Sequence, residues 1–331
     1  MGLMGHMRRM GLMCPIGLRN PIRDGKLAAM AISSNLLPGM WSFSATLFPS
    51  MSRFLYLSVL GAVLCLFALA APGRAEQPAA LSFPDETIDM WHGFKRHKFT
   101  VDGCAAWVVE PKQALPGNPW SWCMMFPDAF TDRCAAPTLI EKGFHHAFID
   151  VGNTFGAPSA LKHCSAFYDT LIAHGLAKKA VLIGISRGGL YSYRFASENP
   201  EKVALIYGDA PVCDFKSWPG GKGKGKGSPG DWASLLKVYG FTDEAAALGY
   251  QGNPIDVLPT LARAHISLIH VVGDADDVVP LAENTAIIEE RYAKLGGEIR
   301  VIHKPGVGHH PHGLDDPTPV VQFIVEHTAA R

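Results

Sequence analysis

The feature that most constrains this chain is a short apolar run that breaks directly into a glycine-rich turn. Residues 181–185 form an apolar run of the kind found in buried parallel strands, and residues 184–189 read G-I-S-R-G-G. Residues 190–199 then have the composition of a helix that stops before a proline. Glycines beside Ser186 allow a strand and a helix to approach closely. The stretch therefore predicts a strand, a sharp turn with a nucleophilic Ser186 at its apex, and a helix.

Length and charge limit the classes of protein that this chain can form. It has 331 residues, of which 48% are hydrophobic, enough for one large α/β domain or two small ones. Lys plus Arg and Asp plus Glu both number 30, so the formal net charge is zero. Bulk electrostatics therefore do not point to a nucleic-acid partner.

The first 75 residues do not read as domain sequence. Residues 1–50 are rich in Met, Gly and Pro, and we predict that they are a disordered leader or lie upstream of the natural start at Met51. Residues 51–75 combine Arg53, an apolar run and small residues at a cleavage position, which predicts a signal peptide, with a membrane anchor as the alternative. Residues 76–331 are then one catalytic domain that is secreted or periplasmic, with no stable membrane insertion after cleavage.

Five cysteines follow residue 76, and their spacing predicts no special chemistry. An odd number leaves at least one thiol free or paired between chains, and no pair has the C-x-x-C spacing of a zinc or redox site. We expect most of them to be buried as small apolar residues. The sequence predicts no cofactor and no metal.

The order of the predicted elements favours an α/β fold. An antiparallel N-terminal hairpin comes first, and from about residue 120 strands alternate with helices, as in a mostly parallel central sheet covered by helices on both faces. Residues 211–260 form an irregular insertion, which we interpret as a lid. The predicted strands are 94–101, 104–110, 120–126, 145–151, 181–185, 203–207, 265–272 and 298–303. The predicted helices are 158–174, 190–199, 281–295 and 318–329, together with one within 128–142 that starts near Asp132 or near Pro137.

Acidic and imidazole side chains gather in the loops after the last predicted strands. A serine is a weak nucleophile until a base takes its proton, and that base needs an orienting carboxylate. Both groups are expected just past the carboxyl ends of later strands, at the same edge as Ser186. The candidate acids are Asp274, Asp276 and Asp277, with Asp209 and Asp214 as alternatives, and the candidate bases are His309, His310 and His312.

These patterns together resemble the α/β-hydrolase superfamily, from about residue 94 to the C-terminus. The resemblance rests on the G-x-S-x-G of residues 184–188, on G-D-A-D-D-V-V-P at 273–280, and on the Gly-His pair at 308–309. It implies an α/β-hydrolase fold. The usual form of the two loops in that superfamily selects Asp276 as the acid and His309 as the base.

Further segments are similar to a group of exported bacterial serine esterases that accompany polysaccharide-degrading enzymes. This similarity implies a polysaccharide or small-molecule ester as the substrate, and in particular an ester of a decorated carbohydrate. The similar segments are residues 184–190, 199–204, 209–214, 217–221 and 308–312.

Acyl transfer to a serine also needs two hydrogen-bond donors for the negative charge that develops on the carbonyl oxygen. The first is expected to be the backbone N–H of Arg187, the residue after the nucleophile. The second is expected from the loop after the strand at 120–126. Pro127 has no N–H, so Phe126 or Asp128 must supply it.

Residues of the insertion and of the histidine loop are the candidate substrate contacts. Trp218 is expected either to stack on a sugar ring or to hold the lid, and Asp214 either to contact substrate or to form a turn. His310 and His312 are candidates because only one histidine acts as the base. The lysines of residues 220–227 either meet an anionic group such as a uronate or belong to a solvated loop.

The sequence therefore predicts a secreted serine hydrolase that cleaves carboxylic esters through Ser186, His309 and Asp276 with an acyl-enzyme intermediate. A serine peptidase of the same fold is one alternative. A non-catalytic carbohydrate-binding module on a hydrolase scaffold is another, although a complete Ser, Asp and His set counts against it.

Overall fold

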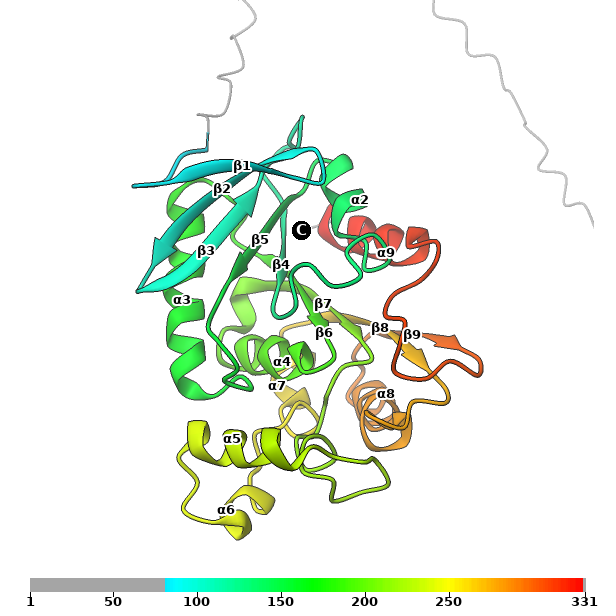
Figure 1. Ribbon diagram of the computed structural model, residues 1–331. Coiled ribbons are helices and arrows are strands. Elements are labelled where there is room, and N and C mark those ends of the chain that lie inside the picture. Colours follow the sequence, from blue (N-terminus) through cyan, green and yellow to red (C-terminus); the bar gives the residue numbers. More distant parts are fainter. Residues whose placement is uncertain (1–80, 330–331) are drawn as a thin grey trace, which may run out of the picture. The chain divides into compact units, whose positions relative to one another are not determined.

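The computed structural model describes residues 81–329 of the chain (Figure 1). The predicted leader (1–50) and signal peptide (51–75) lie outside the described residues. The described part forms a nine-stranded sheet in the order β1-β2-β3-β5-β4-β6-β7-β8-β9. The strands are β1 (Thr87–Trp91), β2 (Phe94–Val101), β3 (Cys104–Val109), β4 (Trp120–Cys123), β5 (His145–Ile149), β6 (Ala180–Ile185), β7 (Val203–Asp209), β8 (Ser267–Gly273) and β9 (Ile299–Lys304).

The sheet has an antiparallel edge and a parallel remainder. β1, β2, β3 and β5 pair antiparallel in succession, and β2 and β3 form a hairpin in which Val101 lies opposite Cys104. From β5 through β4, β6, β7 and β8 to β9 every pairing is parallel. The carboxyl ends of β6, β7, β8 and β9 therefore meet at one edge, where the loops that follow them converge.

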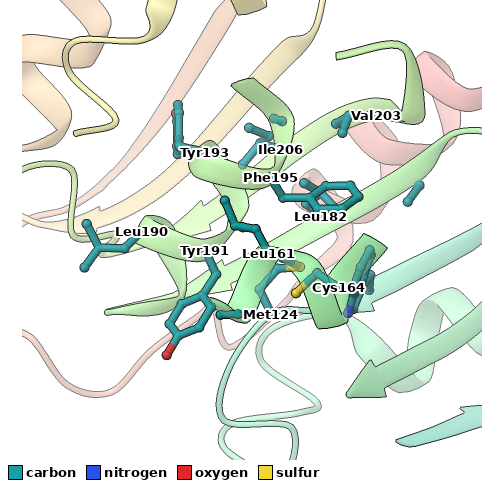
Figure 2. Packing of buried hydrophobic residues seen from close by; sticks show 14 of the residues in the cluster. Met124, Leu161, Cys164, Leu182, Leu190, Tyr191, Tyr193, Phe195, Val203 and Ile206 are labelled. Atoms are coloured by element: carbon teal, nitrogen blue, oxygen red, sulfur yellow. The ribbon is translucent and has the colours of Figure 1, made fainter. Parts of the chain in front are cut away.

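Helices cover both faces of this sheet (Figure 1). On β6 the apolar side chains alternate: Leu182 belongs to the apolar cluster that includes residues of α3, α4, α7 and α8, whereas Val181 and Ile183 belong to the cluster that includes residues of α2 and α9. Figure 2 shows the first of these clusters, with Leu161 of α3 near Leu182 and the aromatic residues of α4. These helices are α2 (Ala136–Glu141), α3 (Pro158–Ala173), α4 (Gly188–Glu198), α7 (Leu258–Arg263), α8 (Thr285–Lys294) and α9 (Thr318–Ala329).

Two segments differ from the sequence prediction. β1 was not among the predicted strands, and it forms because pairing with β2 and a two-point contact between Asp89 and Arg96 (2.8 Å each) support it. The helix predicted within 128–142 is α2, which begins close to the later of its two expected starts, because Phe130 and Ala135 before it have positive φ values of 52° and 71° that a helix does not admit. The helix predicted at 281–295 begins only at Thr285, after a short 3₁₀ turn.

The insertion at 211–260 is more ordered than predicted. It contains α5 (Pro229–Tyr239) and α6 (Glu244–Leu248) before α7. α5 begins at a proline and ends at Gly240 in the left-handed conformation, and the Asp243 side chain caps α6 by accepting the Ala246 N–H at 2.8 Å. The prediction of an irregular segment was wrong because short helices leave little periodicity to detect.

The Ser186 turn needs glycine at position 184. A Cβ at Gly184 would lie 2.5 Å from Ser192 Oγ and 2.9 Å from the Gly188 carbonyl oxygen, whereas a Cβ at Gly230 in α5 would meet nothing within 4 Å. We predict that Gly184→Ala lowers the free energy of unfolding by about 1–3 kcal/mol through overpacking. Gly230→Ala, the matched control, should leave it unchanged or raise it by up to about 1 kcal/mol. Urea titrations followed by tryptophan fluorescence measure both, and equal stability of the two variants would contradict this account.

Candidate active site

Ser186 lies in the turn between β6 and α4, with a φ of +51°. This left-handed conformation is strained for a residue other than glycine. Its N–H donates to the Asp209 carbonyl oxygen at 2.8 Å, and its own carbonyl accepts the N–H groups of Gly189 (3.0 Å) and Val212 (2.8 Å). Backbone bonds to two neighbouring segments thus hold the strained turn.

His309 and Asp276 meet Ser186 at the same sheet edge. Ser186 Oγ lies 2.9 Å from His309 Nε2, and His309 Nδ1 lies 2.7 Å from Asp276 Oδ2. Because a carboxylate only accepts, Nδ1 of the ring donates to Asp276, and Nε2 of the neutral ring accepts from the serine hydroxyl. The other carboxylate oxygen accepts the N–H groups of Val278 (2.9 Å) and Val279 (2.8 Å). Asp276 and His309 are both buried.

The two aspartates that flank Asp276 have other partners. Asp274 accepts from His303 at 2.7 Å, at the exposed end of β9. Asp277 is exposed and forms an ion pair with Lys226 at 2.5 Å, which holds its pKa below the ordinary value. The structure therefore brings only Asp276 of these three to His309.

Asp214, predicted as a substrate contact, lies away from Ser186. Its Oδ1 accepts the Lys216 N–H at 2.9 Å, and burial raises the pKa of the carboxyl. It does not line the cavity beside the nucleophile. The alternative expectation of a turn residue describes this position, because the carboxylate closes a local loop with the residue two positions on.

Asp209, the other alternative acid, pairs with a different histidine. His312 Nδ1 lies 2.7 Å from Asp209 Oδ1, and Asp209 Oδ2 accepts the Tyr207 hydroxyl and the Gly313 N–H, each at 2.8 Å. The carboxylate is completely buried, and His312 is 3% exposed. Sequence reasoning named both residues but did not pair them.

A cavity of about 310 Å³ opens beside Ser186. Its volume is at the small end of the range for ligand sites. Apolar side chains dominate its wall, together with three imidazoles and one guanidinium. The lining residues are Phe126, Ala129, Phe130, Ile185, Ser186, Arg187, Trp218, Val278, His309, His310 and His312.

His310 lies at the exposed rim of this cavity. Its ring stacks on Phe130 with centroids 5.8 Å apart and meets His312 edge to face at 4.8 Å. Partial burial, and then the neighbouring imidazoles of His312 and His309, lower the pKa of His310. Phe130, which touches two of the histidines, was not singled out from the sequence, because it lies in a loop without a recognisable motif.

The Arg187 side chain is held inside the protein. Its guanidinium lies over the rings of Trp218 (5.1 Å), Phe155 (5.3 Å) and Phe126 (5.5 Å). Two further side chains meet its Nη1: Asn153 accepts a hydrogen bond, and Asp231 lies 3.5 Å away. The guanidinium is thus in contact with an acid of the protein itself, Asp231 of α5. Trp218 belongs both to the cavity wall and to the contacts that hold the insertion.

The two backbone N–H groups predicted to form an oxyanion site belong to residues that line the cavity. Within residues 81–329, neither the Arg187 nor the Phe126 N–H donates to another protein group. Phe126 has a φ of +61°, lines the cavity and directly precedes Pro127. Asp128, the alternative donor, does not line the cavity, and its carboxylate accepts the Trp91 indole N–H at 3.0 Å.

The lysine-rich segment at 220–227 contacts acidic residues in the loop and 3₁₀ turn after β8 and in α6 of the insertion. Lys222 forms an ion pair with Glu244 at 2.6 Å, and the Lys224 N–H donates to Glu283 at 2.5 Å. Together with the Lys226–Asp277 pair, these contacts neutralise the charges of Lys222 and Lys226. They support neither of the two expectations for these lysines, an anion site or a loop without partners.

Between residues 81 and 329, no group of three or more His, Cys, Asp or Glu side chains is arranged to hold a metal ion. In the same range, no helix is long and apolar enough to cross a membrane. The five cysteines from Cys104 to Cys213 are free thiols.

Comparisons with known proteins bear on the fold. No protein-family model matches the chain, and no curated protein matches its sequence. Among solved structures it is similar to dipeptidyl peptidase 4 of Porphyromonas gingivalis (TM-score 0.53, 16% identity, 73% of this chain and 35% of that chain). It is also similar to a protein described as a dipeptidyl aminopeptidase IV from Bacteroides ovatus (TM-score 0.53, 14% identity, 74% of this chain and 36% of that chain). A third similar structure is described as a lipase from Acinetobacter baumannii (TM-score 0.51, 13% identity, 72% of this chain and 93% of that chain).

These likenesses establish the fold. The similar structures are α/β-hydrolases, and the chain has the α/β-hydrolase fold, as predicted. It spans about a third of the length of the two peptidases. At such low identity the comparisons leave the chemistry to be argued from the site itself.

The environment of His310 predicts its titration. Because burial and two neighbouring imidazoles disfavour the charged ring, the pKa of His310 should lie below its ordinary value of 6.5. The ring should therefore stay neutral at a mildly acidic pH at which a free histidine is protonated. Histidine proton resonances recorded against pH, with the His310 signal assigned by its absence in His310→Asn, measure this. A midpoint at or above 6.5 would refute the prediction.

Proposed function

We propose that this protein is a serine hydrolase that cleaves carboxylic esters through an acyl-enzyme. The observation that carries the proposal is the unbroken chain of two short hydrogen bonds from Asp276 through His309 to Ser186, beside a cavity. A serine in a strained turn, a neutral imidazole with its acceptor nitrogen on the hydroxyl, and a buried carboxylate behind it are the parts that acyl transfer needs.

In the first half of the reaction, Ser186 Oγ attacks the ester carbonyl while His309 Nε2 takes the hydroxyl proton. Asp276 stabilises the imidazolium that forms and keeps the ring in the required tautomer. The N–H groups of Arg187 and Phe126 donate to the oxyanion, for which they have no competing protein acceptor in the described part. His309 then gives its proton to the leaving alcohol, and the acyl group remains on Ser186.

In the second half, water replaces the alcohol. His309 takes a proton from the water, the hydroxide attacks the acyl carbonyl, and Ser186 leaves with the proton returned by His309. These side chains carry out every proton transfer, so the proposed reaction involves no cofactor.

The walls of the cavity favour a compact, uncharged group next to the ester. The Arg187 guanidinium lies 3.5 Å from Asp231 and over three aromatic rings, and Lys222 and Lys226 pair with protein acids. Trp218 and Phe126 offer apolar surface, and His310 offers a polar rim. An acetyl or aromatic acyl group on a carbohydrate fits this chemistry. We extend the proposal to such decorated carbohydrates, met by a secreted or periplasmic enzyme.

The loss of the nucleophile should abolish turnover. We predict that Ser186→Ala lowers kcat/KM for p-nitrophenyl acetate at least about 10³-fold, because the attacking oxygen is gone. Ser197→Ala is the matched control, since that hydroxyl only donates to the Arg194 carbonyl on α4 and should not affect activity. The same proteins are assayed for acetate, methanol and aromatic acids released from acetylated, methyl-esterified and feruloylated polysaccharides, and for cleavage of dipeptide p-nitroanilides.

The outcomes of this panel separate the candidate functions. Ester cleavage that depends on Ser186 supports the proposal, and the released acid or alcohol identifies the substrate class. Amide cleavage without a preference for esters would favour a serine peptidase. Equal inertness of wild type and Ser186→Ala toward every ester would contradict the proposal and favour a carbohydrate-binding module.

The role of Asp276 as the catalytic acid is tested by replacing it and its two neighbouring aspartates, one at a time, with asparagine. Asp276→Asn should lower kcat about 10²- to 10⁴-fold, because an amide donates to His309 Nδ1 and forces the wrong tautomer. Asp274→Asn and Asp277→Asn should retain activity within about threefold, since they lose only exposed ion pairs. Steady-state kinetics of the three variants provide the test, and a larger loss in either control would move the role away from Asp276.

A further inference from the structure

The Asp209–His312 pair has the same chemistry as the pair that orients the base, yet the proposed reaction does not use it. Asp209 accepts from three donors and is completely buried, so it is held as a hydrogen-bond acceptor. Nδ1 of His312 therefore carries a proton, and whenever the ring is neutral its Nε2 presents a lone pair. The tautomer of this second imidazole is as strongly determined as that of His309.

The Nε2 atom of His312 lacks a protein partner. Within residues 81–329 no hydrogen bond reaches this nitrogen, although the residue is 3% exposed and lines the cavity beside Ser186. This nitrogen is not one of the fully enclosed polar atoms that lack a partner, so it is open to the cavity, where a donor brought by a ligand can reach it. His310, at the rim, has no carboxylate partner in the described part to select a tautomer.

We propose that His312 is a specificity-determining residue, which accepts a hydrogen bond from a hydroxyl group of the leaving alcohol. The inference rests on the proposed ester hydrolysis and names the kind of ester: a monoester of a vicinal diol, as in a partly acylated sugar or glycerol. The donor is a free hydroxyl on the carbon next to the ester-bearing carbon, and His312 Nε2 accepts its hydrogen bond.

The position of the two rings places this contact on the alcohol side. His309 returns its proton to the leaving alcohol, so the ester oxygen of that alcohol must lie within hydrogen-bond distance of His309 Nε2. The His309 and His312 rings meet edge to face with centroids 4.8 Å apart. The two oxygens of a vicinal diol lie closer together than these centroids, and the hydrogen bond that each oxygen makes bridges the remaining distance. One alcohol can therefore meet both imidazoles.

The test compares two esters of nearly equal size. The full-length protein is assayed with 2-hydroxyethyl acetate and with propyl acetate, in which a methyl group replaces the hydroxyl. We expect the kcat/KM ratio of the two esters to be about tenfold higher in the wild type than in His312→Asn. The asparagine amide still donates to Asp209 but offers nothing at the Nε2 position. The intrinsic reactivities of the esters cancel when the ratios of two proteins are compared.

Asp209→Asn is the second variant, and it keeps the His312 ring. An amide at 209 donates to His312 Nδ1, which moves the ring proton to Nε2 and turns the acceptor into a donor. The ratio should fall as it does in His312→Asn. His303→Asn is the matched control, because His303 forms a pair of the same length (2.7 Å) with Asp274 on the exposed part of the chain. It should keep the wild-type ratio.

Each outcome gives a decision. Equal ratios in wild type, His312→Asn and Asp209→Asn would overturn the inference, while Ser186-dependent cleavage of both esters would leave the proposed function standing. If neither buried variant folds, the wild-type ratio is compared with that of hydroxide-catalysed hydrolysis, and equality of the two overturns the inference. Cleavage of neither ester by the wild type overturns the proposed function and the inference with it.

Discussion

The hydrogen bond from the Ser186 N–H to the Asp209 carbonyl oxygen joins the two strand ends on which the rest of the site depends. It holds the left-handed Ser186 turn at the end of β6 against the end of β7, while Val212, just beyond β7, donates back to the Ser186 carbonyl. The close approach of strand and helix excludes a side chain at Gly184. The nucleophile, the start of α4 and the origin of the insertion are thus positioned by one junction, and the strain at Ser186 is offset by backbone bonds around it.

A single loop after β9 supplies both oriented imidazoles. Asp276, after β8, holds His309, and Asp209, at the end of β7, holds His312. Two side chains hold the backbone of this loop: Arg133 Nε donates to the His312 carbonyl at 2.7 Å, and Lys304 Nζ donates to the Pro311 carbonyl at 2.6 Å. Parallel strands that end at one edge make this arrangement possible, since consecutive carboxyl ends present consecutive carboxylates to the same loop.

The insertion contributes shape more than charge. Its lysine-rich segment is paired with acids of the insertion and of the acid loop, and Arg187 is enclosed by three aromatic rings, Asn153 and Asp231. The cavity is therefore walled mainly by apolar surface, with imidazole nitrogens as its principal polar groups. In such a site, discrimination between substrates depends on fit and on individual hydrogen bonds, because an unpaired polar atom is costly where water is excluded.

The sequence by itself determined the strand, turn and helix around Ser186, the mostly parallel sheet, and the loops that carry Asp276 and His309. These features have local causes: apolar runs, glycines that admit close packing, and the position of loops after strands. The tertiary structure alone decided which partner each side chain has. β1 forms through its pairing with β2, the Asp214 carboxylate closes a local turn, and the Arg187 guanidinium lies beside Asp231. Asp209 and His312 are 103 residues apart in the chain, and only the convergence of β7 and the last loop brings them within 2.7 Å, because no local pattern encodes a contact between distant segments.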